Sequence, residues 1–449
     1  MPDGELVCAR ESGDDRELPG GWRFARLRDV AIEMFGGGTP STKNPKYWGG
    51  QIPWTTSAVI AESDTVLSGY QRSISEIALR ESSTRIAPAG SLLIGTRVGV
   101  GKCVVTPFAV AINQDLTAVV VKADAAIADY IAFALKLDSI RRWIDGAKRG
   151  TTIKGIPRDD IGRLVLPLPP LEEQRAIARV LRTIQRAKEA TEKVIAATRE
   201  LKKSLLRHLF TYGPGPLASM SQVELQETPM GAAPAHWTIG RLGDPDVAEI
   251  RTGTSAFPTK YPTGAERLLF LKVSDLNDLA NSRVVTRAAS EARLTTDSLS
   301  KLSYVPTGSV VFPKRGAAIA TNKKRLTGQP SLLDPNLIAL CPGSNVVPKY
   351  LLAWLENFDL RSITDDATLP QINKKDLQAL AFPIPTSSEQ ERIVASLDAV
   401  DGKLDADRCL SWTLSSLFQT LLRDLMSGRR RVRGTERSAE TTASDGDRS

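Results

Sequence analysis

Residues 96–103 contain the pattern in this sequence that most invites a chemical interpretation. Gly99, Gly101 and Lys102 follow one another closely, as in glycine-rich loops whose backbone N–H groups cradle phosphates. However, Thr96 stands where such a loop has its first glycine, and Cys103 replaces the Ser or Thr that binds magnesium. The pattern therefore does not predict a nucleotide-binding loop.

A second near-motif lies at residues 44–47, where Asn-Pro-Lys-Tyr stands in place of the Asn-Pro-Pro-Tyr of DNA amino-methyltransferases. Lys46 breaks that motif, and the glycines at 36–38 are too close to it to form a separate cofactor site. Neither His208 nor His236 lies near a serine or cysteine that could act as a nucleophile. We expect no catalytic centre and no metal site, and a stand-alone DNA methyltransferase is the less favoured alternative.

Basic and polar residues gather on turns between strand-like runs in both halves of the sequence. Lys and Arg neutralise phosphates, and Arg, Asn and Thr read base edges in a DNA groove. Arg97 and Arg315 occupy corresponding places, and nearby glycines suit close approach of a ligand. A solvated charged surface is the alternative. The residues predicted to bind DNA are Lys43, Lys46, Tyr47, Thr96, Arg97, Lys102, Thr152, Lys154, Lys260, Lys272, Lys314, Arg315, Lys323, Lys324 and Lys374.

Two long helices are the elements that must position these loops. Residues 167–174 and 383–390 both read Pro-x-Pro, three further residues, then Glu-Gln. Proline prevents helix up to that point, and carboxylates suit the exposed N–H groups of a helix start. In the second copy Ser387 or Ser388 can supply the capping oxygen. The sequence therefore predicts the same helix start twice.

Apolar residues follow both starts at the three-and-four spacing of one helical face. Each run extends for about 40 residues, or roughly 60 Å, and a helix of that length is typical of coiled coils. We predict that the two helices pair antiparallel; the alternative is two unrelated amphipathic helices on separate cores. The residues predicted to pair are Ile177, Leu181, Ile184, Leu201 and Leu205 in the first helix, and Ile393, Leu397, Val400, Leu404, Leu414, Leu417 and Leu421 in the second.

The whole chain repeats at a period near 216 residues. Trp22 and Trp237 are 215 residues apart, Arg97 and Arg315 are 218 apart, and the two Glu-Gln pairs are 216 apart. Because this offset drifts by only a few residues, the chain consists of two homologous halves with small loop insertions. Two copies are too few for a solenoid, and a pseudo-twofold molecule is the better interpretation.

Short strand-like runs mixed with helical periodicity place each globular part in the α+β class. We predict two homologous globular domains joined by two long antiparallel paired helices. Gly and Pro between the halves predict a linker without regular structure. The predicted boundaries are 1–17 for a disordered N-terminus, 18–160 for the first globular domain, 161–213 for the Pro-x-Pro turn and first helix, 214–235 for the linker, 236–376 for the second globular domain, 377–428 for the second turn and helix, and 429–449 for a disordered basic tail.

Composition narrows the class of protein further. The 449 residues are 41% apolar, with a formal charge of +8 and a pI near 9.3, which favours a polyanionic partner. No apolar run approaches the length of a membrane span, and the polar, acidic residues 1–16 do not form a targeting signal. Four scattered cysteines indicate neither a disulfide framework nor a zinc site. A cytoplasmic protein is the expectation.

Together these features closely resemble one family, the specificity (S) subunits of type I DNA restriction–modification systems. The resemblance rests on the doubled Pro-x-Pro…Glu-Gln starts, the repeat, Gly-Thr-Pro-Ser at 38–41, the loop at 95–102, Asn-Gln-Asp-Leu at 113–116 and Thr-Thr-Ile-Lys at 151–154. It covers nearly all of residues 18–428. The second half departs from it at 334–337 and 313–315, which suits two domains that read different DNA sequences.

The resemblance implies that each globular part is a target-recognition domain that reads one half of a bipartite, asymmetric site in double-stranded DNA. The paired helices would fix the spacing between the half-sites. The chain would carry no catalytic centre and bind no cofactor. It would dock two modification subunits, which hold S-adenosylmethionine and methylate adenine, and optionally two motor-nuclease restriction subunits. A coiled-coil scaffold that binds only protein is the alternative from the residues alone.

Overall fold

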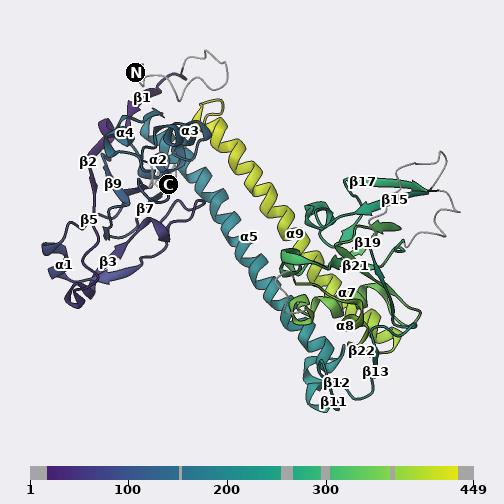
Figure 1. Cartoon of the computed structure of the whole chain (residues 1–449). Helices are drawn as coiled ribbons and strands as arrows, with labels where there is room; N and C mark the ends of the chain where they lie inside the picture. The colour runs from purple at the N-terminus through teal and green to yellow at the C-terminus, as the bar shows by residue number, and fades with distance from the viewer. Residues whose placement is uncertain (1–17, 151–153, 254–265, 295–303, 365–369, 433–449) are drawn as a thin grey trace, which may run out of the picture. The chain divides into compact units, whose positions relative to one another are not determined.

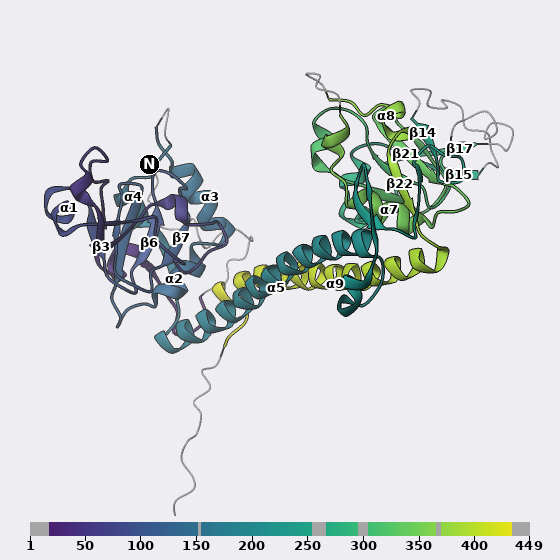
Figure 2. The same ribbon diagram turned by 90° about the horizontal axis from the view of Figure 1, so that it is seen from below.

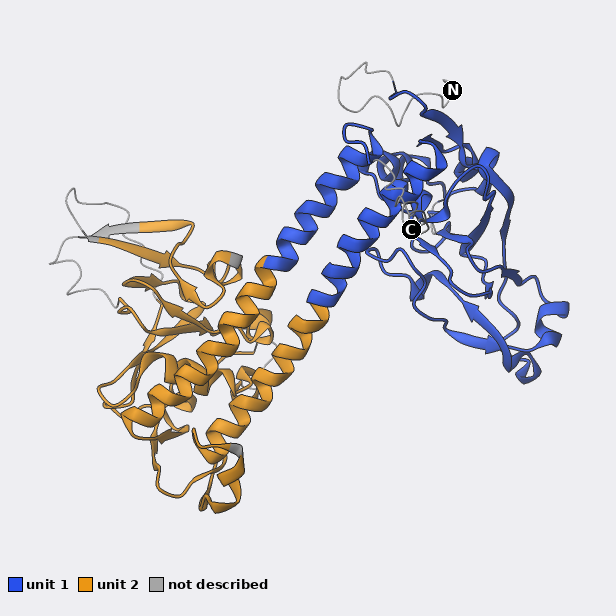
Figure 3. Cartoon of the chain, turned by 180° about the vertical axis from the view of Figure 1, so that it is seen from behind, with its two compact units in different colours: residues 1–191, 410–449 blue, residues 192–409 orange. Residues whose placement is uncertain are grey.

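The computed structural model describes residues 18–150, 154–253, 266–294, 304–364 and 370–432 of the chain. The chain folds as two compact units (Figure 3), one made of residues 1–191 and 410–449 and the other of residues 192–409. The predicted disordered N-terminus and the predicted DNA contacts Thr152 and Lys260 lie outside the described residues. No helix within the described ranges is both long and apolar enough to cross a membrane.

Unit 1 contains two four-stranded sheets, ordered β2-β9-β6-β7 and β4-β3-β8-β5, and a separate pair of strands, β1 and β10. Figure 1 shows these strands together with the short helices α2 and α3. The elements are β1 (Arg23–Arg26), β2 (Ala31–Gly36), β3 (Trp48–Thr55), β4 (Arg72–Ile74), α1 (Glu76–Glu81), β5 (Arg85–Ala87), β6 (Leu92–Gly95), β7 (Cys103–Val105), β8 (Val110–Ile112), β9 (Leu116–Val121), α2 (Ala128–Ala134), α3 (Asp138–Ala147), α4 (Arg158–Arg163) and β10 (Val165–Leu168).

The central sheet of unit 1 is buried on both faces. Because successive side chains of a strand point to opposite faces, Leu92 and Ile94 of β6 pack against α2 and α3, whereas Leu93 packs toward the second sheet with Val104 and Ile112. Fully buried strands read as continuous apolar runs, which is why β6 stands out in the sequence. The loops that follow its strands are therefore attached to a rigid core.

Unit 2 has the same arrangement around a five-stranded sheet, ordered β14-β21-β18-β19-β16, and a three-stranded sheet, β17-β15-β20. Val310 and Phe312 of β18 face α7, and Val311 faces the opposite core. The elements are β11 (Leu225–Thr228), β12 (Gly231–Pro234), β13 (Thr238–Arg241), β14 (Ala248–Thr252), β15 (Glu266–Leu271), β16 (Val284–Val285), β17 (Ser290–Leu294), β18 (Val310–Pro313), β19 (Arg325–Thr327), β20 (Ser331–Leu333), β21 (Leu337–Pro342), α7 (Pro348–Glu356), α8 (Lys374–Gln378) and β22 (Ala381–Ile384).

Two long helices, α5 (Leu171–Tyr212) and α9 (Ser387–Met426), contribute to both units. In unit 1 the beginning of α5 and the end of α9 share one core, which includes Ile177 and Leu425. In unit 2 the end of α5 and the beginning of α9 share another, which includes Leu209 and Ile393. Figures 1 and 2 show the two helices side by side within unit 2. The predicted fold class, α+β with a duplicated domain and two long antiparallel helices, is confirmed.

The predicted pairing stripe divides into three groups by burial. Ile177, Leu181, Ile393, Leu397 and Leu404 are buried, but the first four also belong to the cores of the globular domains, so they do more than pair helices. Ile184, Leu205, Val400, Leu414 and Leu421 are half-buried. The prediction is wrong for Leu201 and Leu417, which are 58% and 42% exposed.

The Glu of each Glu-Gln pair binds a tryptophan from the start of its own globular domain. The Trp22 indole N–H donates to Glu173 (3.1 Å), and the Trp237 indole N–H donates to Glu389 (3.2 Å). Glu173 is only 7% exposed. Its main contacts are therefore tertiary, and the interpretation as a group that only complements the helix start is incomplete.

The Gln of each pair joins the long helix to a short helix of the globular domain. The Gln174 amide accepts from the Ile127 N–H (2.9 Å) and donates to the Pro169 carbonyl (2.9 Å). The Tyr130 hydroxyl donates to the Pro167 carbonyl (2.7 Å), and burial raises its pKa well above the usual value. Unit 2 repeats these contacts with Gln390, Val347, Pro385, Tyr350 and Pro383. The shared motif therefore encodes a shared helix–domain junction.

The structure corrects three sequence-based expectations near the ends of the helices. The α9 cap is Thr386, whose hydroxyl accepts from the Glu389 N–H (3.4 Å), and not Ser387 or Ser388. The predicted linker 214–235 contains the hairpin of β11 and β12. Within the predicted disordered tail, Arg431 donates to Glu173 (2.6 and 2.8 Å), because a carboxylate readily accepts two bonds from one guanidinium.

Candidate nucleic-acid interface

The loop that follows β6 is held by backbone hydrogen bonds to two other segments of unit 1. The Thr96 N–H donates to the Asp115 carbonyl (2.8 Å), and the Ile156 N–H donates to the Thr96 carbonyl (2.8 Å). Thr96 is buried and its hydroxyl lies 3.3 Å from the Asp115 carbonyl, whereas the next residue, Arg97, is exposed. We call these three segments, residues 95–97, 113–115 and 155–157, the first frame.

The glycines of this loop close it on itself. The Gly101 N–H donates to the Gly95 carbonyl (2.9 Å), and the Lys102 N–H donates to the Gly99 carbonyl (3.1 Å). Gly99 and Gly101 have φ of +63° and +88°, which glycine adopts without the strain that a side chain would bring. These amides are engaged within the loop, so they do not form a phosphate cradle. The Lys102 ammonium donates to the Ile60 carbonyl (2.7 Å), and that bond would have to break before it could reach DNA.

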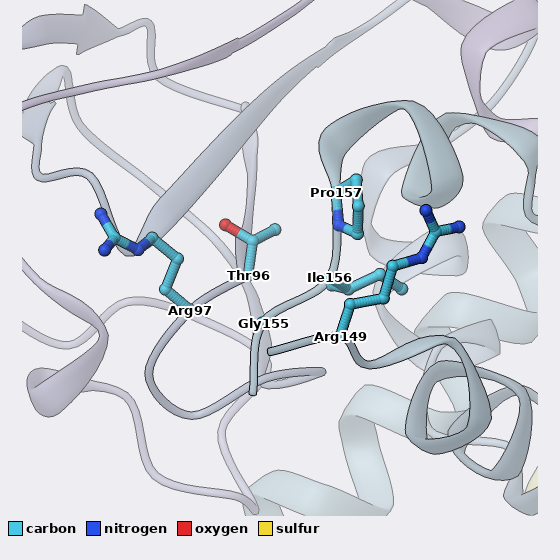
Figure 4. A pocket seen from close by; sticks show the side chains of 6 residues that line it. All are labelled: Thr96, Arg97, Arg149, Gly155, Ile156 and Pro157. Atoms are coloured by element: carbon cyan, nitrogen blue, oxygen red, sulfur yellow. The ribbon is translucent and has the colours of Figure 1, made fainter. Parts of the chain in front are cut away.

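A pocket of about 260 Å³ opens beside the first frame, between two arginines. Figure 4 shows the guanidinium groups of Arg97 and Arg149 on opposite sides of Thr96 and Gly155. Arg149 donates to Asp160 (2.8 Å), a carboxylate that is only 8% exposed. The pocket is lined by Thr96, Arg97, Arg149, Gly155, Ile156 and Pro157.

Unit 2 repeats this arrangement after β18. The Lys314 N–H donates to the Asn336 carbonyl (2.8 Å), and the Ile372 N–H donates to the Lys314 carbonyl (3.0 Å). These two bonds match those of Thr96, so Arg315, which is exposed, takes the place of Arg97. We call residues 313–316, 334–336 and 370–373 the second frame. Backbone geometry thus places an arginine at the same point of both domains.

Burial changes the interpretation of the lysines near the second frame. Burial and the adjacent Arg315 lower the pKa of Lys314. Lys324 is 3% exposed and donates to the Phe358 carbonyl (2.6 Å); burial lowers its pKa to about 8. The prediction that Lys324 binds DNA is therefore wrong for this conformation, since its ammonium faces the protein interior. Lys323 is half-buried and donates to Asn277 (2.5 Å).

The remaining predicted residues are placed in several parts of the two domains. Lys43, Lys46, Lys154, Lys272 and Lys374 are exposed. Only Lys154 and Lys374 directly adjoin the frames in sequence; Lys46 and Tyr47 belong to the segment that enters β3. The Tyr47 hydroxyl donates to Glu81 (2.8 Å), and this bond raises its pKa. Frame residues and scattered lysines are thus distinct sets.

Sequence reasoning missed the carboxylates and amides that hold the arginines. Asp160 binds Arg149, and Gln371 accepts from the Arg315 Nε–H (2.9 Å). Asp160 and Asp376 are 216 residues apart, so the repeat offset was the signal that could have singled them out. Among the described residues there is no group of His, Cys, Asp and Glu side chains suited to a metal ion.

Comparison with known proteins gives consistent matches over both halves. Residues 19–198 and 234–408 match the family model of the type I restriction modification DNA specificity domain. The chain is 24% identical to the type I restriction enzyme MjaIX specificity subunit of Methanocaldococcus jannaschii, over 93% of this chain and 96% of that protein. It is 26% identical to the EcoR124I/EcoR124II specificity subunit of Escherichia coli over 33% of this chain and 37% of that protein. The crystal structure of a type I S subunit from M. genitalium matches with a TM-score of 0.58 at 15% identity, covering 92% of this chain and 97% of that one.

Proposed function

This chain belongs to the family of type I restriction–modification DNA specificity subunits, and from that premise we propose that its two frames read the two halves of a bipartite, asymmetric DNA site. The observation that carries the proposal is the repeated backbone geometry, which presents Arg97 and Arg315 from matching loops. The loops differ in sequence, Gly-Thr-Arg against Pro-Lys-Arg, as two domains with different targets require.

The exposed arginines supply base recognition, and the exposed lysines supply phosphate contacts. An arginine that contacts both O6 and N7 of guanine discriminates against other bases by about 1–3 kcal/mol. Phosphate contacts fix position without reading sequence, which suits Lys43, Lys46, Lys154 and Lys374 on the surface. Lys102 and Lys324 do not contribute, because their ammonium groups are bound to backbone carbonyls.

The long helices set the separation of the half-sites. α5 and α9 are uninterrupted over 42 and 40 residues, and each helix is built into the cores of both units. A continuous helix rises about 1.5 Å per residue, so removing two turns from both helices shortens the spacer by a defined length. The preferred spacing between half-sites is expected to shorten with it.

Two modification subunits dock on the helix surfaces that the domains leave uncovered, and two restriction subunits join them optionally. Exposed apolar side chains are favourable docking points. On α9 the exposed Leu410, Trp412 and Leu417 are 47%, 71% and 42% exposed, and on α5 Val194 and Leu201 are 42% and 58% exposed. The chain binds no cofactor itself; S-adenosylmethionine belongs to the modification subunits.

The experiment that tests this proposal is genome-wide sequencing of methylated adenines in cells that carry the chain with its modification partner. A bipartite motif is expected, absent when either protein is missing. Arg97→Ala is expected to relax one half-site only. Methylation by the chain alone would indicate a stand-alone methyltransferase. Loss of modification-subunit binding in Trp412→Ala, but not in Arg408→Ala, tests the docking surface.

A protein-binding scaffold without DNA specificity makes a different prediction. Such a scaffold would bind DNA weakly and without preference, whereas a specificity subunit bound to its modification partner shifts a target duplex in a strongly salt-dependent manner. Titrating the complex against target and scrambled duplexes at two salt concentrations separates the two functions.

A further inference from the structure

Three polar side chains stand in a row behind Arg315 in the second frame. The Arg315 Nε–H donates to the Gln371 carbonyl oxygen (2.9 Å). The Gln371 amide N–H donates to the Asn373 side-chain oxygen (3.1 Å), and the Asn373 amide N–H donates to the Asp376 carboxylate (3.1 Å). The row therefore runs from an arginine to a carboxylate through two amides.

The chemistry of the carboxylate fixes the direction of the whole row. An ionised Asp only accepts hydrogen bonds, whereas an amide has one accepting and one donating end. Asn373 must turn its NH₂ toward Asp376, which leaves its oxygen for Gln371. Gln371 then turns its own oxygen to Arg315. The row thus ends on the one group that can only donate.

The backbone holds the two ends of this contact together. Arg315 and Gln371 lie opposite each other as an antiparallel bridge, and the Gly316 N–H donates to the Pro370 carbonyl (2.8 Å). Arg315 itself has an extended backbone, with φ of −138°. With Nε held by Gln371, the two terminal nitrogens have no protein partner among the described residues, and the side chain is exposed. They are the pair of donors that a guanine edge requires.

The first frame lacks this arrangement. Its second segment forms the same kind of contact opposite Arg97, but there Gly155 replaces Gln371: the Gly155 Cα faces the Thr96 carbonyl, and a Cβ would lie 2.9 Å from that oxygen. Asp160, which corresponds to Asp376, is engaged by Arg149. Arg97 has no side-chain hydrogen bond or ion pair within the described part of the chain. The same backbone therefore carries a fixed arginine in one domain and an unrestrained one in the other.

We propose that Gln371 is a positioning residue that fixes Arg315 to read one guanine in the half-site of the second domain. The inference rests on the proposed function and adds to it the base and the residue that sets the preference. Holding Nε limits the rotation of the guanidinium plane, so less rotamer freedom is lost when both terminal nitrogens bind O6 and N7. Arg97, without such a neighbour, discriminates less sharply.

The test compares methylation motifs in cells that carry the modification partner with the wild-type chain or with Gln371→Met, Gln371→Glu or Arg315→Ala. Gln371→Met keeps length but cannot accept the bond, and about a tenfold loss of preference for guanine over other bases is expected at one position of one half-site. Gln371→Glu keeps an acceptor for Arg315, and its preference is expected to stay close to that of the wild type.

The matched control is Gln378→Met, the same substitution at an exposed position of α8, which is expected to leave both half-sites unchanged. Arg315→Ala is expected to remove the same preference more completely, and Gln371→Met in that background to add nothing. Thermal unfolding of each purified chain shows whether the variants fold.

The outcomes separate this inference from the proposed function. A bipartite wild-type motif that Gln371→Met retains overturns the positioning role alone. A second half-site unchanged in Arg315→Ala overturns the assignment of Arg315 as the reader. Absence of any partner-dependent motif with the wild-type chain overturns the proposed function, and this inference with it.

Discussion

In unit 1 Arg182 of α5 pairs with Asp129 at the start of α2, whereas in unit 2 Asp398 of α9 pairs with Lys349 at the start of α7 (2.6 Å). The two positions are equivalent, because Arg182 and Asp398 each lie eight residues beyond the Gln of their Glu-Gln pair. The helix–domain junctions therefore share their hydrogen bonds to the backbone and carry opposite charges on the same two positions.

Further along, the junctions differ in kind. In unit 2 Asp401 is 5% exposed and pairs with Lys202 (2.9 Å) and Arg283 (3.0 Å). In unit 1 the corresponding region holds the tilted ring pair of Phe133 and Phe418, 6.0 Å apart. Hydrogen bonds to the backbone can persist in both copies because the backbone is common to them, while side-chain pairs are free to diverge. Each domain has thereby become matched to its own helices.

The largest expected effect comes from what the junctions share. Gln174→Ala or Gln390→Ala leaves one buried N–H and one carbonyl without a partner in its own unit. We expect a loss of about 2–4 kcal/mol of unfolding free energy. Peptide-level hydrogen exchange is expected to show lost protection in α2 for the first variant and in α7 for the second. Equal loss in both helices from either variant would contradict separate junctions; the exposed Arg175→Ala is the control.

The next effect concerns two lysines that precede equivalent strands, Lys102 before β7 and Lys324 before β19. Because burial lowers the pKa of Lys324 to about 8, the unfolded chain binds a proton between pH 8 and its usual value near 10.5 that the folded chain does not. Stability is therefore expected to rise with pH across that range, by on the order of 2–3 kcal/mol, and to be lost as pH falls through 8. Urea unfolding of Lys324→Met is expected to lack this rise.

Lys102→Met is the matched control for the pH experiment, since Lys102 is only half-buried and likewise donates to a carbonyl. It is expected to keep the rise seen in the wild-type chain. If Lys324→Met kept the same slope as the wild type, the ammonium would not be buried in the folded protein.

A smaller effect is expected from reversing the charges. Arg182→Asp faces Asp129, and Asp398→Arg faces both Lys349 and Arg283; each is expected to cost about 1–2 kcal/mol, since these groups are partly exposed. Adding Asp129→Lys is expected to restore unit 1 fully. Adding Lys349→Asp restores unit 2 only in part, because Arg283 remains. Double-mutant cycles from thermal unfolding measure both; equal rescue in the two units would argue against Arg283 as the difference.

The smallest effect is expected on the exposed helix surface. Leu201→Ala and Leu417→Ala remove side chains that are 58% and 42% exposed, and each is expected to change the unfolding free energy by less than about 0.5 kcal/mol. Leu404→Ala on the same stripe removes a side chain that is 3% exposed and is expected to cost about 2–4 kcal/mol. A cost for Leu201 equal to that for Leu404 in chemical denaturation would restore the continuous seam predicted from periodicity.

Much of the architecture was readable from local patterns. Proline stops followed by a periodic run predicted helices at 161–213 and 377–428, and α5 and α9 occupy 171–212 and 387–426. The drift-free offset of the repeat predicted that Arg97 and Arg315 correspond, and the backbone bonds around them do. Periodicity could not separate Leu201 from Leu404, because it reports a face of a helix and not what covers that face.

The sequence by itself determined the duplication, the two helix starts and the pair of arginine loops, since each is written in residues that are close together or repeat at a constant offset. Only the tertiary structure decided that Glu173 binds Trp22 across 151 positions, that Lys324 is buried against Phe358, and that Gln371 holds Arg315 from 56 positions away. These contacts depend on how strands and loops meet in space. A lysine on a turn reads the same in sequence whether its ammonium faces water or a carbonyl.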